Sequence, residues 1–533
     1  MASAEHAWTH DHAWKPVADL LRRFSALTSL RYESSHQLSP CILDALHQYH
    51  PHCRLHMRTF CARTLLQPEK DKHELAIASS PCLHSIWFKY MDEEEDIYAR
   101  YSQKVVQQVL ATLAPNVEDV RFLRSQLTQR RSRRSMVPQG MELVHLEKDR
   151  INRSTRLKRL IIAASHYGGV ELARHELEGW HRHVDFSCLR TLLLNAPLEL
   201  GALRWLSNCN FASLKELALQ LHDDDDAEGE RAMQLATKFV VSLPPLSNLF
   251  IRDPWTRSSY RIIDIVMRHG ASLHTFRLQH RNGISIRPAT RMLKFMRTRC
   301  SQLRELTFSI LREQGSIDEM RLYKLFAGFP TLRCLDLTLV AGGGLASTFT
   351  RGGQRVILPR GPACHEYNDF DQQILEDVTR DHNPLYGDVR RAFIDKAIDE
   401  NFGRTVYRLA CAPNRLRSLK KFVLTSDPYF FVDSQRRNSP IREVFSHICR
   451  SWTVQPGIRD DRPDELVVRE MDRPRDIEVD PAPEKLDPRI KKVFRRIWPG
   501  SEDGSSDWRT DWHSFLACDE GTDEPEIPPA SQS

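Results

Sequence analysis

The strongest constraint on this chain is a short apolar phrase that recurs at nearly regular intervals between residues 155 and 338. The phrase has an apolar residue, two free positions, a second apolar residue, one free position and a third apolar residue. Its seven copies are Leu157/Leu160/Ile162, Leu189/Leu192/Leu194, Leu214/Leu217/Leu219, Leu246/Leu249/Ile251, Leu273/Phe276/Leu278, Leu303/Leu306/Phe308 and Leu332/Leu335/Leu337. Successive copies begin 32, 25, 32, 27, 30 and 29 residues apart. A period of this length indicates stacked structural repeats.

The phrase resembles the strand of the leucine-rich repeat and predicts an α/β fold. One repeat alone leaves its apolar triplet uncovered, so neighbouring repeats must stack to close the core. Earlier copies begin at Leu27, Leu83 and Val117, and a last copy begins at Leu419. We therefore predict an irregular leucine-rich-repeat solenoid, a horseshoe with short parallel strands inside and helices outside.

The apolar spacing also predicts how the chain is divided. We expect a solenoid over residues 1–340 with a basic loop at 129–140, a glycine-containing insertion at 341–386, a terminal helix and last repeat at 387–450, and a partly disordered extension at 451–533. Helical stretches are predicted between the strands, including one that Ser39 caps and one continuous helix over 388–411. Gly270 suits a left-handed position after a helix end.

Charge and composition restrict the partners and the compartment. The chain has 76 basic and 70 acidic residues, so its net charge of +6 creates no overall field, and nucleic acid is an unlikely partner. The sequence contains neither a membrane span nor the apolar core of a secretory signal. Its twelve cysteines are scattered without a C-x-x-C pair, which favours reduced thiols. We predict a cytoplasmic or nuclear protein that does not contact a membrane.

Known catalytic and cofactor patterns are absent from the sequence, so we predict no enzyme activity, no cofactor and no metal. The histidine-rich segment from His47 to His56 lacks the spacing of a zinc site. The run from Arg130 to Arg134 is either a nuclear import signal or solvated charge. A catalytic site assembled from distant residues is the less favoured alternative.

The side of each strand opposite the apolar triplet is the best candidate for a binding surface. Residues that alternate with the triplet point to the concave face of a solenoid. Aromatic and arginine residues are the usual anchors of protein interfaces. We therefore predict a protein-binding surface formed by Trp87, Arg121, Phe250, Arg252, Arg277 and Gln279. The alternative is that these are ordinary solvated positions or lie beneath the C-terminal region.

Two segments resemble a group of filamentous-fungal proteins, the F-box and leucine-rich-repeat-like proteins. They are SLRYESSHQLSPCILDALHQYHPHCRLHMRTF near the start and FRRIWP at Phe494–Pro499. The resemblance implies a substrate receptor of a cullin-type ubiquitin ligase, in which the F-box docks to the ligase adaptor and the solenoid holds the substrate. Only about 26 residues precede the first repeat strand, without a Leu-Pro opening, so no F-box is visible. A nuclear regulatory scaffold without a ligase link is the alternative function.

Overall fold

The structure is a computed structural model of the 533-residue chain. It describes residues 11–34, 37–58, 60, 72–89, 107, 109–111, 113–114, 116–124, 156–164, 171–221, 227–252, 259–279, 290–341, 347–349, 355–357, 367–376, 384–411, 419–426, 440–457, 465–471, 485–500 and 507–516. The chain divides into two compact units. We call residues 1–222 with 227–252 the N-terminal unit, and residues 253–533 with 223–226 the C-terminal unit.

Strands and helices alternate along the N-terminal unit. Its strands are β1 (Ser29–Tyr32), β2 (Arg54–Met57), β3 (Leu83–Lys89), β4 (Asp119–Arg124), β5 (Arg159–Ala164), β6 (Thr191–Pro197), β7 (Glu216–Gln220) and β8 (Asn248–Arg252). Its helices are α1 (Asp11–Arg23), α2 (Pro40–Tyr49), α3 (Lys72–Ala78), α5 (Arg174–His183), α6 (Leu200–Leu206) and α7 (Ala227–Ser242), with a 3₁₀ turn η3 (Phe186–Cys188). Each strand pairs in parallel with the next along the chain, from β1 to β8.

The C-terminal unit begins with the same alternation and then departs from it. Its strands are β9 (Thr275–Gln279), β10 (Glu305–Arg312), β11 (Cys334–Ala341), β12 (Ser347–Phe349), β13 (Arg355–Ile357), β14 (Lys421–Ser426), β15 (Trp452–Pro456) and β16 (Leu466–Glu470). Its helices are α8 (Ser259–His269), α9 (Thr290–Arg299), α10 (Ile317–Leu325), α11 (Tyr386–Lys396), α12 (Glu400–Ala410), α13 (Pro440–Ile448) and α14 (Pro488–Ile497), with 3₁₀ turns η5 (Gly270–Ser272) and η6 (Phe326–Gly328). β9, β10, β11 and β14 are parallel, whereas β15 and β16 continue the sheet antiparallel.

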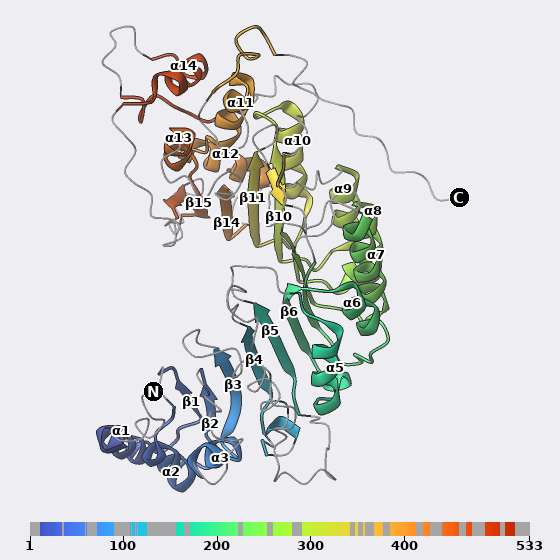
Figure 1. Cartoon of the computed structure of the whole chain (residues 1–533), viewed down its shortest axis with the longest axis vertical. Helices are drawn as coiled ribbons and strands as arrows, with labels where there is room; N and C mark the ends of the chain where they lie inside the picture. The colour runs from blue at the N-terminus through green and yellow to red at the C-terminus, as the bar shows by residue number, and fades with distance from the viewer. Residues whose placement is uncertain are drawn as a thin grey trace, which may run out of the picture. The chain divides into compact units, whose positions relative to one another are not determined.

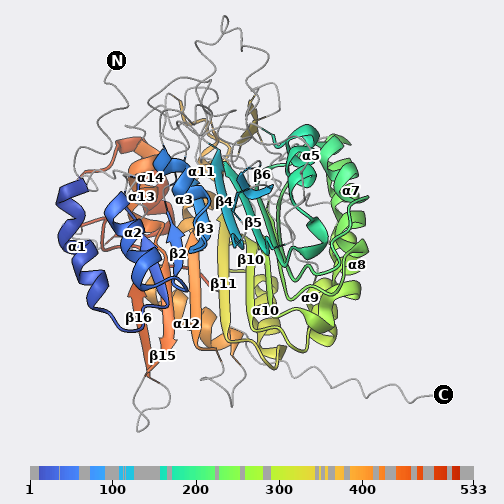
Figure 2. The same cartoon turned by 90° about the horizontal axis from the view of Figure 1, so that it is seen from below.

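The strand register confirms the predicted α/β leucine-rich-repeat architecture. Leu160, Leu192, Leu217 and Leu249 are partners on four adjacent parallel strands, and each is at most 1% exposed. The helices α5 to α7 lie on one side of these strands and cover the triplets (Figure 1). Burying each such leucine stabilises the fold by roughly 1.5–3 kcal/mol. The view in Figure 2 shows β2 to β5 side by side in the same order.

Two local predictions, the Ser39 cap and the left-handed Gly270, were wrong in detail. Ser39 precedes α2 but makes no side-chain cap, because its hydroxyl bonds the Asp11 carboxylate instead. Gly270 begins the 3₁₀ turn η5, and the described residues with positive φ are Gln314 and Gly315. Space at Gly270 is tight, since a Cβ there would lie 3.2 Å from the Arg299 Cβ and from its carbonyl oxygen.

The helix predicted over 388–411 is divided into α11 and α12. The break is fixed by Asp399, whose carboxylate accepts the backbone N–H of Phe402 and so caps α12. The predicted last repeat strand is β14, which pairs with β11. In the C-terminal extension, the apolar residues at 466–468 and 490–497 predict a strand and a short helix, and these are β16 and α14. β15 was not predicted.

A second core lies in the C-terminal unit beyond the repeats. It joins apolar residues of α11, α13 and α14 to Trp508, and Trp512 and Phe515 pack against it. We call residues 507–516, which carry these aromatic side chains, the C-terminal strap. The extension at 451–533 therefore includes an ordered segment that closes a core.

Other predictions fall outside the described residues. These are the basic loop at 129–140 with its arginine run, more than half of the insertion at 341–386, and the end of the chain from 517. The proposed limits of the solenoid, the insertion and the extension remain predictions. In the part of the chain that the structure describes, no helix is both long and apolar enough to span a bilayer.

Candidate functional site

The strands of the N-terminal unit present a second face, opposite their buried triplets, which we call the open face. Register places six side chains in one row across it, from β3 to β8: Trp87, Arg121, Ile161, Leu193, Ala218 and Phe250. Three of the predicted binding residues therefore lie in a single row of the same unit. This arrangement follows from the two-residue period of a strand, since each stands between two inward residues.

Trp87 lies between two arginines at the start of this row. The Arg58 guanidinium carbon is 4.7 Å from the centre of the indole ring, and that of Arg121 is 5.8 Å from it. Arg58 also pairs with Glu33 at 3.0 Å, and Arg121 contacts Asp119 at 3.4 Å. The two cations hold the indole by cation–π contact and leave it half-buried. Trp87 is thus a rigid aromatic side chain within a charged surrounding.

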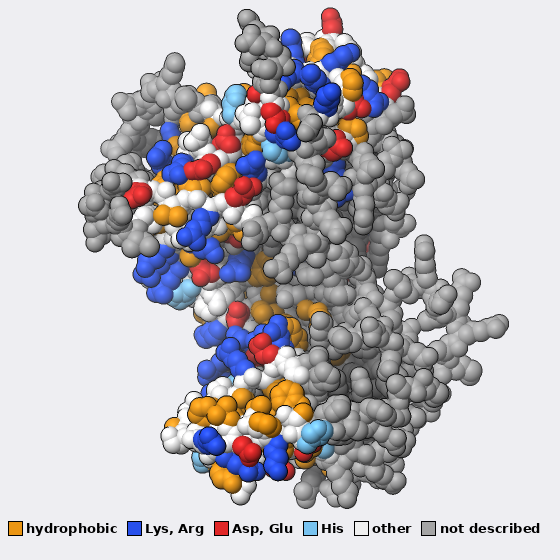
Figure 3. Space-filling view, turned by 90° about the vertical axis from the view of Figure 1, so that its left-hand side faces the viewer, with side chains coloured by type: hydrophobic (Ala, Val, Ile, Leu, Met, Phe, Trp, Pro, Cys, Tyr) orange, Lys and Arg blue, Asp and Glu red, His pale blue; other side chains and the backbone are white. Residues whose placement is uncertain are grey.

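The other end of the row is apolar. Ile161, Leu193 and Phe250 are half-buried, whereas Ala218 is only 2% exposed. Arg252, one open-face position beyond Phe250 on β8, places its guanidinium 5.4 Å from the centre of the Phe250 ring. The row therefore changes from charged and aromatic at β3 and β4 to aliphatic and aromatic at β5 to β8. Lys and Arg side chains form groups, with exposed hydrophobic side chains between them, on the side of the molecule drawn in Figure 3.

A polar row runs beside the first one. Thr191 and Arg159 both contact Glu216, at 3.0 and 3.6 Å, and Arg159 also lies 3.9 Å from Asp119. On β2 and β3, a ring nitrogen of His56 hydrogen-bonds to the Ser85 hydroxyl at 2.8 Å. These contacts connect neighbouring strands and fix the orientation of the side chains around Trp87.

The His56–Ser85 contact has the distance of a nucleophile and its base. Burial, His84 and Arg31 lower the pKa of His56 and favour its neutral form. Asp119, however, is the register partner of Ser85 on the side away from His56, and no described carboxylate hydrogen-bonds to the imidazole. Because a base needs such a group to orient it, this pair lacks the third member of a triad.

The remaining predicted site residues lie in the C-terminal unit. Arg277 on β9 is exposed and pairs with Glu305 at 3.2 Å, and Gln279 is half-buried two residues further along the same strand. They share the alternation of the open-face row but belong to the other unit. The predicted set is therefore divided into Trp87, Arg121, Phe250 and Arg252 in one unit and these two residues in the other.

The histidine-rich segment is held by ordinary hydrogen bonds. His47 bonds to the Ser80 hydroxyl at 2.7 Å, and His50 bonds to the Leu21 carbonyl at 2.8 Å. Among the described residues no group of three or more His, Cys, Asp or Glu side chains has the arrangement of a metal site. The described cysteines are free thiols, and burial raises the pKa of Cys209 and Cys411 to about 11.

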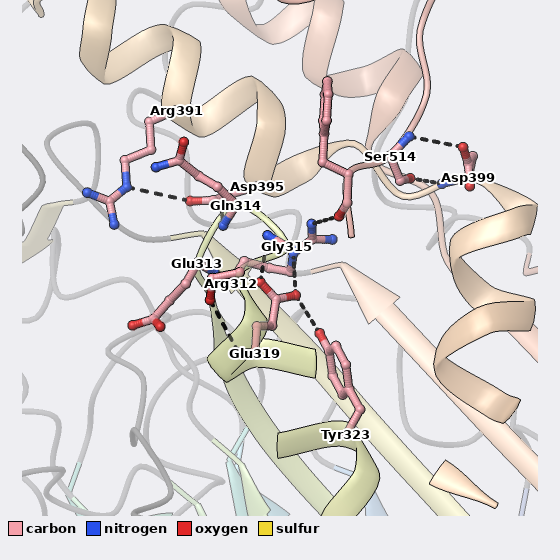
Figure 4. Close-up of polar contacts among 12 residues, drawn as sticks. Arg312, Glu313, Gln314, Gly315, Glu319, Tyr323, Arg391, Asp395, Asp399 and Ser514 are labelled. Atoms are coloured by element: carbon pink, nitrogen blue, oxygen red, sulfur yellow. Dashed lines mark hydrogen bonds and ion pairs between the residues drawn. The ribbon is translucent and has the colours of Figure 1, made fainter. Parts of the chain in front are cut away.

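A buried group of charges at the end of β10 was not predicted. Arg312 follows Leu306, Phe308 and Ile310 at the inward positions of this strand, and its side chain is 0% exposed. Its guanidinium carbon stacks 4.3 Å from the Phe402 ring centre, and its Nε lies 2.9 Å from Glu319 Oε1 (Figure 4). Arg312 Nε and Nη1 have no well-aligned hydrogen bond to a described residue, so the contact between Arg312 and Glu319 is an ion pair and not a hydrogen bond.

Glu319 is the centre of this group. Its carboxylate accepts the backbone N–H groups of Glu313 and Gly315 at 2.8 and 2.9 Å, and the Tyr323 hydroxyl at 2.8 Å. Burial disfavours the charged form of Arg312, but Glu319 and the neighbouring acids outweigh it and raise the pKa of Arg312. Burial and Glu319 raise the pKa of Tyr323 well above its usual value. The group fixes the β10–α10 turn.

Asp395 on α11 completes the group. Its carboxylate accepts the backbone N–H of Gln314 at 2.8 Å and lies 4.0 Å from Arg391 Nε. Burial raises the pKa of Asp395 to about 7, although Arg312 opposes this shift. We regard this group as structural, since every member is buried and bonded to the turn or to a neighbouring helix.

Comparisons with known proteins add no function. No protein family matches the chain, and no curated protein does. A solved structure of the leucine-rich repeat-containing protein LegL7 from Legionella pneumophila aligns with 63% of this chain and 92% of its own, at 13% identity and a TM-score of 0.30. The strand register described above shows directly that strands and helices alternate as in leucine-rich repeats in both units.

Proposed function

We propose that the protein is a non-catalytic recognition module that binds a protein partner on the open face of its N-terminal unit. The single observation behind this is the row from Trp87 to Phe250, which joins a tryptophan between two arginines to three half-buried apolar side chains. Interfaces take most of their binding energy from such aromatic and arginine anchors. An extended segment or helix face with acidic residues near Arg58 and apolar residues near Phe250 would match the row.

Affinity capture with the full chain tests this proposal. Trp87→Ala removes the ring between the two arginines, and Leu193→Ser weakens the apolar half. We expect each variant to lose a protein partner that the wild type retains, with a binding loss of about tenfold or more. Lys238→Ala, an exposed position on α7, is the matched control and keeps the partner. The proposal is wrong if both open-face variants retain the partner and remain folded.

A finer proposal is that the module is the substrate receptor of a cullin-type ubiquitin ligase. One observation favours a second docking place beside the first strands. Val17 and Leu20 on α1 and Phe24 directly after it are 40%, 52% and 49% exposed, at the spacing i, i+3 and i+7 that forms one side of a helix. A ligase adaptor or a helix that precedes α1 would cover this apolar stripe.

Recovery of ligase subunits tests the finer proposal separately. We expect the wild type to capture an adaptor and a cullin, and Leu20→Glu to lose both while it retains the open-face partner. Trp87→Ala has the opposite pattern. Capture of a partner without any ligase subunit favours the alternative of a regulatory scaffold.

A further inference from the structure

A row of basic residues lies at the edge of the C-terminal unit where its strands begin. Arg304, Arg333 and Lys420 directly precede β10, β11 and β14. The backbone N–H of Arg333 donates to the Arg304 carbonyl at 2.8 Å, and that of Lys420 donates to the Arg333 carbonyl at 2.7 Å. These bonds place the three residues at the same point on three adjacent strands, about 4.8 Å apart.

The charges of this row are not neutralised within the described part of the unit. All three side chains are exposed, and none forms an ion pair with a described acidic side chain. Glu305 follows Arg304 in the chain but pairs with Arg277 on the open face. Like charges on neighbouring strands repel one another, so an anion bound along the row would relieve this repulsion.

The N-terminal unit carries a similar row of its own. Lys158, Arg190 and Lys215 directly precede β5, β6 and β7, and the same type of backbone bond joins Arg190 to Lys158 and Lys215 to Arg190, each at 2.8 Å. Lys158 pairs with Glu118 at 2.6 Å, whereas Arg190 and Lys215 have no ion pair to a described residue. A basic residue before the strand is therefore a repeated feature of this chain, although its net charge is close to zero relative to its size.

The surroundings of the C-terminal row favour one kind of anion. Single-stranded nucleic acids are usually held by exposed aromatic rings on which bases stack. Phe329, the aromatic residue that precedes Arg333 in the chain, is only 5% exposed. The Thr331 hydroxyl, two residues before Arg333, donates to the carbonyls of Ser301 and Leu303 and is therefore already hydrogen-bonded within the fold. Among the described residues beside it, the row thus offers a line of cations without an exposed aromatic ring.

We propose that the row Arg304–Arg333–Lys420 binds an extended acidic segment of a polypeptide, a run of Asp and Glu residues that crosses the strand starts. Each carboxylate would accept charge-assisted hydrogen bonds from one or two of these side chains. This surface differs from the open face in its residues and its chemistry. The protein would therefore recognise two features of a partner, or two partners.

The test uses the full chain and a fluorescently labelled oligoglutamate peptide, with binding followed by anisotropy. The triple variant Arg304→Gln, Arg333→Gln, Lys420→Gln is expected to bind about tenfold more weakly than the wild type, and its affinity should depend less on salt. Arg291→Gln, Lys294→Gln, Lys491→Gln changes three exposed cations of the same unit outside the row and is the matched control. It should bind like the wild type. Thermal unfolding verifies that both triple variants are folded.

Three results would overturn the proposal. One is undiminished peptide binding by the Arg304/Arg333/Lys420 variant. The second is an equal loss in the control variant, which would show that only total charge matters. The third is tighter, row-dependent binding of a single-stranded oligonucleotide of matched charge, which would assign the row to nucleic acid. Trp87→Ala changes the open face and not the basic row, so it should leave peptide binding unchanged. The two proposals can therefore fail independently of each other.

Discussion

Arg312 and Phe515 are 203 residues apart in the sequence, and the Arg312 Nη2 donates to the Phe515 carbonyl at 3.1 Å. The contact joins the end of a repeat strand to the C-terminal strap. A second contact lies beside it, where Ser514 and Asp399 exchange two hydrogen bonds of 2.7 and 3.0 Å. The strap is therefore part of the fold of the C-terminal unit, and its loss would remove Trp508 from the core and expose the apolar residues of α11, α13 and α14.

Gly315→Ala should release the strap. Gly315 has φ of +72°, and a Cβ at this position would overlap the Phe515 carbonyl. The backbone conformation and the overlap both disfavour a side chain, so we expect the free energy of unfolding to fall by about 1–3 kcal/mol. Chemical denaturation measures this change. Gly201→Ala is the control, because a Cβ there meets the Glu199 carboxylate at an ordinary 3.4 Å. An equal effect of both substitutions would contradict the assigned role of Gly315.

Arg312→Met should destabilise the C-terminal unit strongly. It removes one partner of a buried ion pair and leaves the Glu319 charge without its cation. Such a loss destabilises a protein by about 3–5 kcal/mol. Arg321→Met provides the comparison, since its pair with Asp318 is exposed and should contribute no more than about 1 kcal/mol. If denaturation curves of the two variants coincide, the buried pair is not a major contributor.

Asp395 should make stability depend on pH. Its pKa is raised from 3.8 to about 7 by burial, so the folded chain retains a proton that the unfolded chain releases between these values. The stabilising contribution of this group is therefore full below about pH 4 and is lost as the pH rises to about 7. The expected slope is roughly 1.4 kcal/mol per pH unit in that interval, with no further change above it.

Asp395→Asn isolates this effect. The amide resembles the protonated acid and can still accept the Gln314 N–H. Compared with the wild type, the variant should gain stability as the pH rises from about 4 to 7. Urea denaturation at several pH values measures the difference. Parallel curves for the two proteins would show that Asp395 does not titrate in this range.

The repeats could be predicted from the sequence because the apolar pattern of each triplet indicates which of its side chains are buried. Leu160, Leu192 and Leu217 occupy the same position within their triplets. Parallel strands that align their triplets bury all three leucines, so this register is favoured. The side chains between them, such as Trp87 and Phe250, could be placed in one row by the same period. Arg121 and Arg252 belong to the same predicted set, but the contact of Arg58 with Trp87 was not predicted, because Arg58 follows β2 and lies outside the predicted repeat triplets.

The sequence did not allow the buried charges and the strap to be predicted. Arg312 continues the inward positions of β10, but its burial depends on Glu319, Phe402 and Phe515, which are brought together only by the complete unit. The break between α11 and α12 has a similar cause, because Asp399 is also bound by Ser514. One sequence signal was available: Ser316 and Glu319 have the spacing of a capping box. Glu319 instead reaches back to Glu313 and Gly315.

Site-specific photo-crosslinking tests the central claim most directly. A photoreactive amino acid is placed at Trp87 or Leu193 on the open face, and in a separate variant at Lys238 on the helix side of the same unit. We expect the two open-face positions to form crosslinks to a common protein partner in cell extract, and position 238 to form none to it. Crosslinks to that partner from position 238 alone would contradict the claim that the open strand face is the recognition surface.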